Sequence, residues 1–483
     1  MRDSTTTEVF LVNPPATLTQ QRGPIKEIVR NLFFNSPPLG LAYIAAVLEL
    51  DGVRVRLMDA GVEGFTPEET AARIIAARPA IVGIGSSSNF FGNALALARM
   101  IRAALPSVYL VLGGPHGTSC ADEVMEQEGF DAVVIGEGEE TTRELVAAVL
   151  GGEELRGVRG LVYREGEEVV RTPPRPFIKD LDALPLPARH LLPLHKYIPQ
   201  PNDSPYLPKQ AMISSRGCPY QCTFCDHGTY GVSYRSFSPA RIVDEMEELV
   251  VRYGARDIAF VDSLFMVSKE RVRRIIEEMR RRRVEVHWTC TIRANVADRA
   301  ILKEMKEAGC WRVRIGIESG SERVLDVIRK EVNLEDVRQS VTVADELGLH
   351  PKAFFMIGHP TETRESIQES MDLALSLPLT DITIQLNTPM PGSVQWHTAN
   401  DHGHFSTPDW NHYTFWEPVY IPHGMTSEEL DRLYRTFYRR FYFRPVTIRR
   451  HLRMFKSWRD IRRFFRGGRI LVDMTIPRRR SHP

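Results

Sequence analysis

The sequence predicts an α/β protein with two parallel sheets in succession: an N-terminal doubly wound sheet, then a partial (β/α)6 barrel, followed by a mainly helical C-terminal region. Short apolar runs alternate with amphipathic helical segments from residue 8 to residue 150, and the alternation resumes at residue 211. A proline-rich stretch that cannot be helical for long interrupts it. The expected divisions are a first domain at 1–150, a connection at 151–210, a second domain at 211–395 and a C-terminal region at 396–483.

The first domain is expected to contain five β-α units. Ligands of such doubly wound sheets bind outside the carboxyl ends of the strands. Strands are predicted at Val9–Val12, Val53–Met58, Ile81–Gly85, Val108–Leu112 and Ala132–Ile135, and helices at Pro38–Leu50, Pro67–Ala77, Asn93–Leu105, Cys120–Glu128 and Glu139–Leu150.

Three loops at these strand ends are rich in small residues, whose backbone N–H groups allow close approach of a large polar ligand. A flavin or a nucleotide remains an alternative ligand. The G-x-G-x-x-G motif is absent after the first strand, which weakens a nicotinamide interpretation. The candidate binding residues are Ser86, Ser87, Ser88, Gly113, Gly114, Glu137 and Gly138.

The connection begins with two strand-like runs, Val158–Tyr163 and Glu168–Arg171, which predict a β-hairpin. Proline-rich segments follow and favour an extended chain. We expect a linker that packs over both domains.

The second domain repeats the β-α alternation in six units. In barrels of this type the chemistry lies at the carboxyl ends of the strands. Strands are predicted at Ala211–Ser215, Asp257–Val261, Val286–Ile292, Arg312–Ile317, Lys352–Ile357 and Asp381–Leu386, and helices at Pro239–Tyr253, Lys269–Arg282, Ala297–Ala308, Glu322–Ile328, Leu334–Leu347 and Glu365–Leu377.

Three of the six cysteines, Cys218, Cys222 and Cys225, follow the first of these strands with the spacing C-x3-C-x2-C. Three thiolates on one loop can hold three irons of a cubane iron–sulfur cluster, for which a complete protein set would be four. The open iron would then accept a substrate-like molecule. A Cys3His zinc site that includes His227 is the alternative, whereas the odd number and tight spacing disfavour disulfides.

Polar residues also follow the later strands of this domain. A polar group at successive strand ends favours a site, although Glu318 as an exposed helix cap is the alternative. The candidates are Asp262 and Ser263 after the second strand, Arg293 after the third and Glu318 after the fourth; His359–Thr363 and Asn387–Gly392 follow the fifth and sixth.

The C-terminal region departs from this pattern. Residues 397–417 are rich in aromatic residues, His and Pro without a period, which suits a lid or a substrate pocket. Ser427–Phe443 is predicted to be helical with a broad apolar face. The basic run from Arg449 to Arg469, interleaved with large apolar residues, indicates either a membrane-surface helix or the solvated face of a docking helix.

Composition narrows the class of protein further. The chain of 483 residues is 43% hydrophobic with a net charge of +1, so it is typical of a globular protein with no nucleic-acid partner. We see no signal peptide and no apolar run that could span a bilayer. Few, unpaired cysteines indicate a reducing compartment, and we expect a cytoplasmic location, with membrane association through the C-terminal region.

The segment SSRGCPYQCTFC (214–225), with an aromatic before its third cysteine, resembles the radical S-adenosylmethionine (SAM) enzymes. In that family a [4Fe–4S] cluster binds the amino and carboxylate groups of SAM through its open iron, and reductive cleavage gives a 5′-deoxyadenosyl radical. The resemblance implies an electron donor of flavodoxin or ferredoxin type. It also implies cluster ligation by Cys218, Cys222 and Cys225, an adenine contact by Phe224, SAM contacts by Asp262, Ser263, Arg293 and Glu318, and catalytic roles for Asp262 and Glu318.

The first domain resembles the cobalamin-binding domain that precedes the radical SAM core in one branch of that family. The matching segments are PPLGLAYIAAVLE (37–49), GGPH (113–116) and IGEGEET (135–141). The D-x-H-x-x-G motif is absent, so the resemblance implies cobalamin without a histidine ligand from that motif. His116 is a further candidate ligand, with a surface histidine in a Gly-Gly-Pro turn as the alternative.

The resemblance covers roughly residues 8–395 and implies a cobalamin-dependent radical SAM enzyme. Its expected reaction is methyl transfer from methylcobalamin to an unactivated centre of a small-molecule or lipid-like substrate. A radical rearrangement or an oxidative cyclisation, as in the anaerobic magnesium-protoporphyrin monomethyl ester cyclase, is the alternative within the branch. A tRNA methylthiotransferase would carry further cysteines before residue 218, and a zinc-and-nucleotide binding module is the most distant reading.

Overall fold

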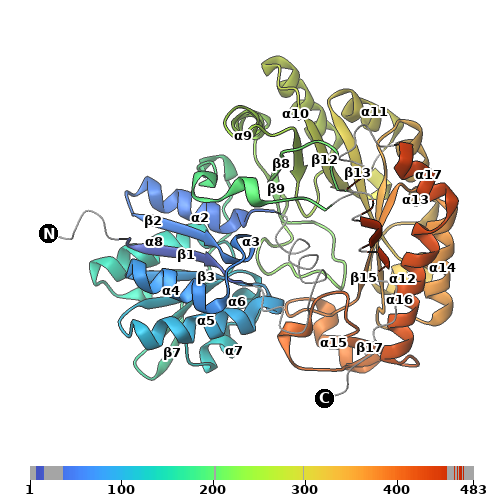
Figure 1. The fold of residues 1–483 in the computed structure, drawn as a ribbon. Coiled ribbons are helices and arrows are strands. Elements are labelled where there is room, and N and C mark those ends of the chain that lie inside the picture. Colours follow the sequence, from blue (N-terminus) through green and yellow to red (C-terminus); the bar gives the residue numbers. More distant parts are fainter. Residues whose placement is uncertain are drawn as a thin grey trace. The chain divides into compact units, whose positions relative to one another are not determined.

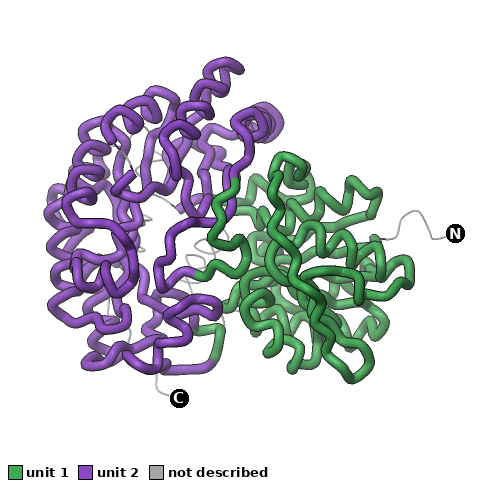
Figure 2. Tube along the Cα trace, turned by 180° about the vertical axis from the view of Figure 1, so that it is seen from behind, with its two compact units in different colours: residues 1–198, 226–235, 409–412 green, residues 199–225, 236–408, 413–483 purple. Residues whose placement is uncertain are grey.

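The computed structural model describes residues 7–15, 36–200, 203–296 and 298–453, with positions 462, 465, 467–469 and 471–472. The chain divides into two compact units, coloured green and purple in Figure 2. Unit 1 comprises residues 1–198, 226–235 and 409–412. Unit 2 comprises residues 199–225, 236–408 and 413–483.

Unit 1 is built on a seven-stranded sheet with the order β2-β1-β3-β4-β5-β6-β7. The first five strands pair in parallel, which confirms the predicted doubly wound sheet, and the last two pair antiparallel. The strands are β1 (Val9–Asn13), β2 (Val55–Asp59), β3 (Ile81–Gly85), β4 (Tyr109–Gly113), β5 (Ala132–Val134), β6 (Leu161–Glu165) and β7 (Glu168–Arg171).

Successive residues of β1 serve the two faces of this sheet, as strand geometry requires. Phe10 and Val12 belong to the hydrophobic core that includes α4 (Pro67–Ala77) and α5 (Phe91–Ala104). Val9, Leu11 and Asn13 instead line a cavity together with α2 (Leu39–Leu50) and α8 (Gly138–Gly151). One face is therefore packed and the other is hollowed; Figure 1 shows α2 on the opposite side of the strands from α4 and α5.

Two parts of unit 1 differ from the expectation. The predicted hairpin forms β6 and β7, which extend the sheet, so residues up to 198 belong to unit 1. The single helix predicted over Cys120–Glu128 is two short helices, α6 (Pro115–Ser119) and α7 (Ala121–Glu126). Pro115 occupies the first turn of α6, where its fixed φ starts a helix and its missing N–H costs nothing, so the helix begins earlier.

Unit 2 contains a six-stranded parallel sheet with the order β15-β14-β13-β12-β11-β8, which confirms the predicted partial barrel. Its strands are β8 (Lys209–Met212), β11 (Asp257–Phe260), β12 (His287–Ile292), β13 (Cys310–Glu318), β14 (Lys352–Ile357) and β15 (Asp381–Leu386). The helices between them are α9 (Pro239–Val251), α10 (Lys269–Arg282), α11 (Arg299–Glu307), α12 (Glu322–Val327), α13 (Leu334–Glu346) and α14 (Arg364–Ser376).

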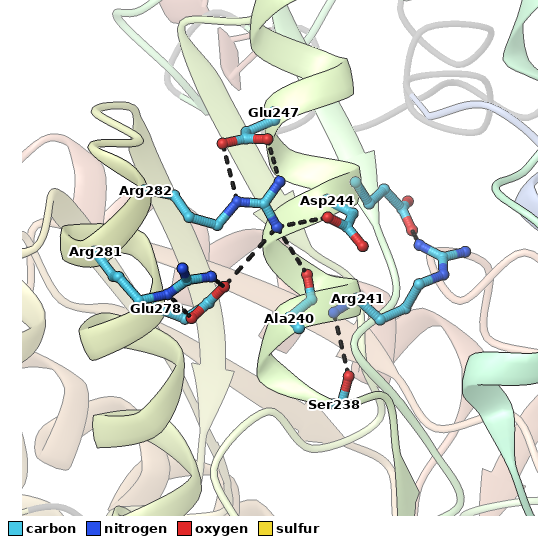
Figure 3. Close-up of polar contacts among 9 residues, drawn as sticks. Ser238, Ala240, Arg241, Asp244, Glu247, Glu278, Arg281 and Arg282 are labelled. Carbon is cyan, nitrogen blue, oxygen red and sulfur yellow. Dashed lines mark hydrogen bonds and ion pairs between the residues drawn. The ribbon is translucent and has the colours of Figure 1, made fainter.

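Arg282 at the end of α10 links this helix to α9 through hydrogen bonds and ion pairs (Figure 3). Its guanidinium donates to both carboxylate oxygens of Glu247 and to Asp244, and Nη1 also donates to the carbonyl of Ala240 at 3.3 Å. Glu278 on α10 itself lies 3.9 Å away. A planar fork held by several acceptors is stronger than a single surface ion pair, so the two helices are firmly coupled outside the sheet.

The C-terminal region packs on the barrel. It contains α15 (Val394–His402), a hairpin of β16 (Gly403–Phe405) and β17 (Tyr420–Pro422), α16 (Ser427–Tyr442) and α17 (Pro445–Arg453). Part of the segment without a hydrophobic period is nevertheless helical, because α15 includes residues 397–402 and Ser393 caps this helix. The aromatic face of α16 is buried, and the hydroxyl of Tyr438 accepts a hydrogen bond from the Ile384 N–H of β15 at 2.9 Å.

Much of the predicted basic run, including Lys456, Arg459, Arg463 and Arg466, lies outside the described residues. Among the helices that the structure describes, none combines the length and the apolar character that a bilayer span requires.

Candidate functional site

A cavity of about 620 Å³ lies on the hollowed face of the unit 1 sheet. It is lined by residues of β1, β3 and β4, by α2 and α8, and by all three small-residue loops that the sequence singled out. Asp226, Thr229 and Tyr230, from the segment that follows Cys225 in the chain, complete the lining. The volume is within the range of ordinary ligand pockets, and its position at the strand ends is the usual one for this architecture.

Two adjacent glycines shape this cavity differently. A Cβ added to Gly114, which has φ +98°, would lie 2.7 Å from the Ser86 carbonyl, so only glycine fits there. A Cβ added to Gly113 would meet no atom within 4 Å, which leaves open space beside the backbone. The candidate residues Ser86, Ser87, Gly113, Gly114, Glu137 and Gly138 all line the cavity.

Two of the predicted ligand residues are already engaged within the protein. Both carboxylate oxygens of Glu137 lie 2.9 Å from Arg235, and one accepts from the Ile178 N–H at 2.7 Å. Ser88 is not among the lining residues, and its hydroxyl lies 3.1 Å from Nδ1 of His116. Glu137 therefore shapes the loop, while Ser88 supports the histidine.

His116 is fully buried, so the surface reading of this residue is wrong. Its ring stacks on Phe91 with centroids 4.1 Å apart, and Trp410 packs edge-on at 5.3 Å. Burial lowers the pKa of His116 to about 4, so the ring is neutral at physiological pH. Among the described residues that line the cavity, none is a histidine.

The cysteine loop of unit 2 begins after β9 (Ser215–Arg216) at Gly217, whose φ of +78° turns the chain. Contact with the Cys225 thiol lowers the pKa of Cys222 to about 6, with Lys330 and Arg293 assisting and burial opposing. The same contact, together with burial, raises the pKa of Cys225. Positive charge near these sulfurs favours thiolates, which are the form that ligates a metal.

Arg293 joins the cysteine loop to a later turn of the chain. Its Nη1 lies 3.8 Å from the Cys222 sulfur and its guanidinium lies 3.5 Å from the centre of the Tyr220 ring. Its Nη2 donates to the carbonyls of Lys330 and Glu331. The buried arginine thus places positive charge beside the cysteine loop.

Glu318 at the end of β13 is buried, so its reading as an exposed cap is wrong. Its φ of +68° and the register shift between Gly316 and Glu318 mark an irregular strand end, a feature that redirects side chains at functional sites. Its carboxylate accepts from Nζ of Lys330 at 2.6 Å in a buried ion pair.

Asp262 after β11 is held by the strand-end residues that precede the cysteines. Its Oδ1 accepts from the Ser214 N–H and Oγ, both at 2.9 Å, and from Ser215 Oγ at 2.5 Å. Burial raises its pKa, and these hydrogen bonds oppose that rise. Oδ2 is buried and has no partner among the described residues, while the adjacent Ser263 is exposed.

Phe224 lies between an apolar cluster and a group of buried polar side chains. Its ring packs with α12 and lies 5.7 Å from the ring of His359. Gln395 of α15 donates to Thr223 Oγ1 at 3.1 Å and lies 3.4 Å from Nδ1 of His359. Burial lowers the pKa of His359 to about 3 and raises that of Glu362 to about 7.

Two residues of this site were not predicted from the sequence. Lys330 follows α12 in an ordinary charged turn, and Gln395 starts α15 outside the barrel strands. Neither belongs to a motif, and each acquires its role through contacts with Glu318 or His359 that only the fold creates.

The two sites fit an iron–sulfur cluster with SAM and cobalamin respectively. Three thiols with adjacent positive charge and the orphaned Oδ2 of Asp262 suit a cluster that leaves room for a polar ligand. The open space at Gly113, which a Cβ would enter without a clash, suits a bulky group that approaches the backbone.

Comparison with known proteins agrees with these sites. Residues 212–374 match the radical SAM superfamily and residues 25–146 match the B12 binding domain. An uncharacterized methyltransferase of Pyrococcus horikoshii is 34% identical over 91% of this chain and 94% of its own. An anaerobic magnesium-protoporphyrin IX monomethyl ester cyclase of Rubrivivax gelatinosus is 28% identical over 86% of this chain and 75% of its own.

A solved structure shares the fold. The radical S-adenosylmethionine methyltransferase TsrM of Kitasatospora setae, with cobalamin and a [4Fe-4S] cluster bound, has a TM-score of 0.68 and 20% identity. The match covers 89% of this chain and 85% of that one.

Proposed function

Because the chain belongs to the cobalamin-dependent radical SAM methyltransferase family, we propose that it methylates an unactivated centre of a small-molecule or lipid-like substrate. The cofactors of this family are a [4Fe–4S] cluster, SAM and cobalamin. When bound, the cluster supplies the electron that cleaves SAM and cobalamin supplies the methyl group. The observation that carries the proposal is the three-cysteine loop at the strand ends of a six-stranded parallel sheet, in a chain that also folds a glycine-lined cavity.

We propose roles for the residues of unit 2. Cys218, Cys222 and Cys225 ligate the cluster, and the positive charge of Arg293 favours the thiolate of Cys222. Asp262 presents its free oxygen to the amino group of SAM, since a carboxylate is the natural acceptor for an ammonium. Ser263, Phe224 and Glu318 complete the SAM site, and Lys330 holds the Glu318 carboxylate in place.

In unit 1 we propose that the small-residue loops bind cobalamin mainly through backbone groups. Gly113 and Gly114 allow close approach, and Ser86 and Ser87 offer short polar side chains. Glu137 holds its loop through Arg235 and Ile178. These residues orient the bound group and exclude water rather than perform chemistry.

The test of this function uses the full chain, purified anaerobically with cluster and cobalamin, and SAM that carries a trideuterated methyl group. The protein is incubated with a reduced flavodoxin or ferredoxin, which we propose as its class of electron donor, and with a metabolite and lipid extract. We expect 5′-deoxyadenosine and a product that carries the labelled methyl group. If neither 5′-deoxyadenosine nor a labelled product forms with any of the reductants, the proposal is refuted.

Oxidative cyclisation is the second candidate function, and the identity with the Rubrivivax cyclase favours it. The same incubation separates the two reactions. Cyclisation would yield 5′-deoxyadenosine and a product without the labelled methyl group. Methylation would yield 5′-deoxyadenosine and a product that carries the labelled methyl group.

We further propose that α17 contacts an anionic membrane surface. Phe443, Val446, Ile448 and Leu452 are between 37% and 57% exposed, and Arg449 and Arg453 are exposed beside them. Apolar groups add area-dependent attachment and each basic residue adds on the order of 1 kcal/mol, which salt weakens. Arg450 is turned inward, where it bonds the Pro378 carbonyl and Asp345.

Co-sedimentation with liposomes that contain phosphatidylserine tests this contact. We expect binding at low salt, weaker binding at high salt, and at least about a fivefold loss in a Val446→Ser, Leu452→Ser variant. The matched control is Val251→Ser on α9, which changes an 83% exposed valine outside the basic helix and should bind normally. Equal binding to neutral liposomes, or none at low salt, would contradict the proposal.

A further inference from the structure

Unit 1 contains a cluster of three metal-binding side chains outside the cavity. A ring nitrogen of His116, the sulfur of Cys120 and a carboxylate oxygen of Glu123 all lie within 4.8 Å of one another. His116 belongs to α6, Glu123 to α7, and Cys120 joins the two helices. Because the chain changes direction between the two short helices, Glu123 lies close to both His116 and Cys120.

The histidine is prepared as a ligand. Its Nδ1 lies 3.1 Å from the hydroxyl of Ser88, and a proton on Nδ1 that is donated there leaves Nε2 with a free lone pair. Nε2 is buried and has no hydrogen-bond partner among the described residues. Leaving such a group unsatisfied costs about 1–3 kcal/mol, which a bound cation would recover. A hydrogen bond on the far nitrogen is also how proteins orient ligating histidines.

The carboxylate and the surrounding rings are fixed as well. Trp410 donates from its indole N–H to Oε1 of Glu123 at 2.9 Å, which leaves Oε2 for a cation. Phe91 and Trp410 confine the His116 ring from two sides. Each of the two ligand side chains is thus held by a neighbouring residue, as in established metal sites.

The donor set selects the class of cation. Nitrogen, sulfur and oxygen together suit Zn²⁺, whereas Ca²⁺ and Mg²⁺ prefer oxygen alone. Ligand atoms on a tetrahedral zinc lie roughly 3.3–3.6 Å apart, so these side chains would move together by at most about 1.5 Å. Binding would release the thiol proton of Cys120 to solvent, and a water molecule would complete the four ligands.

We propose that His116, Cys120 and Glu123 form a zinc-class metal site, separate from the iron–sulfur cluster and from cobalamin. The site joins α6 to α7. It also holds Glu123 in the orientation in which its carboxylate accepts the hydrogen bond from Trp410, in the segment 409–412. Its role is structural: the metal ties this distant chain segment to the core of unit 1.

The test measures zinc directly on cluster-loaded, cobalamin-loaded full-length protein. The protein is equilibrated with Zn²⁺ alone against a chelator, followed by elemental analysis and zinc X-ray absorption, which iron and cobalt do not obscure. We expect one tightly bound zinc per chain with a single sulfur in its coordination shell. A Cys120→Ser variant should bind zinc more than about tenfold more weakly and lose the sulfur signal.

Two further variants keep the proposal falsifiable. Glu123→Gln retains an acceptor for Trp410 but should also weaken zinc binding, while Glu126→Gln, on the exposed side of α7, should leave it unchanged. Iron content and the unfolding temperature report whether each variant is folded. Wild-type protein without zinc, zinc without a sulfur ligand, or equal affinity in Cys120→Ser would each overturn the proposal.

Discussion

Replacing Cys222 with alanine is expected to abolish both cluster assembly and SAM cleavage. The Cys222 sulfur is the one that Arg293 approaches, and it is buried between its loop and the later strand ends. Without it two cysteines remain, which cannot hold the cubane. Iron should fall from near four per chain to less than about one, and 5′-deoxyadenosine should fall below detection.

Cys310→Ala is the matched control for this change. Cys310 is also buried, at the start of β13, but its sulfur donates to the Arg312 carbonyl at 3.6 Å and contacts the Cys290 thiol, outside the cysteine loop. Its replacement leaves a small cavity and lowers stability by roughly 1 kcal/mol without loss of iron. Normal iron content and normal cleavage in Cys222→Ala would refute the ligand assignment.

The alternation of strands and helices could be predicted because local periodicity carries it. Both sheets appear in the expected order, although boundaries move: the strand expected at Ala211–Ser215 is β8 at Lys209–Met212. Pro115 moved a helix start because a proline at a turn favours initiation more than the apolar spacing that follows it. The hairpin could be predicted, but its pairing with β5 is a long-range property.

The candidate site was predictable only where its residues are close in sequence. The cysteine spacing is local, so it identified the loop directly. The burial of His116 depends on Phe91 and on Trp410, whose segment comes from the distant part of the chain. The ion pair of Lys330 with Glu318 depends in turn on a positive φ and a register shift that no spacing reveals.

Gly113→Leu should remove cobalamin while leaving unit 1 folded. A Cβ at Gly113 meets no atom within 4 Å, so the leucine side chain enters the cavity instead of clashing with the protein. The φ of Gly113 is not positive, so a leucine does not strain the backbone there. Leucine also lowers the conformational entropy of the unfolded chain, which stabilises the folded protein by about 0.5–1 kcal/mol. Gly114→Leu would be uninformative, because the Ser86 carbonyl excludes any side chain there.

The measurement is cobalamin per chain after reconstitution, beside iron content and the unfolding temperature. We expect at least about a tenfold loss of cobalamin with iron unchanged, because the leucine occupies the volume that the corrin approaches. Gly157→Leu is the control, since Gly157 is exposed outside the cavity, also has no atom within 4 Å of an added Cβ, and has an ordinary φ. Full cobalamin loading of a folded Gly113→Leu protein would place the cofactor elsewhere, because a ligand pressed against this backbone cannot share its space with a leucine.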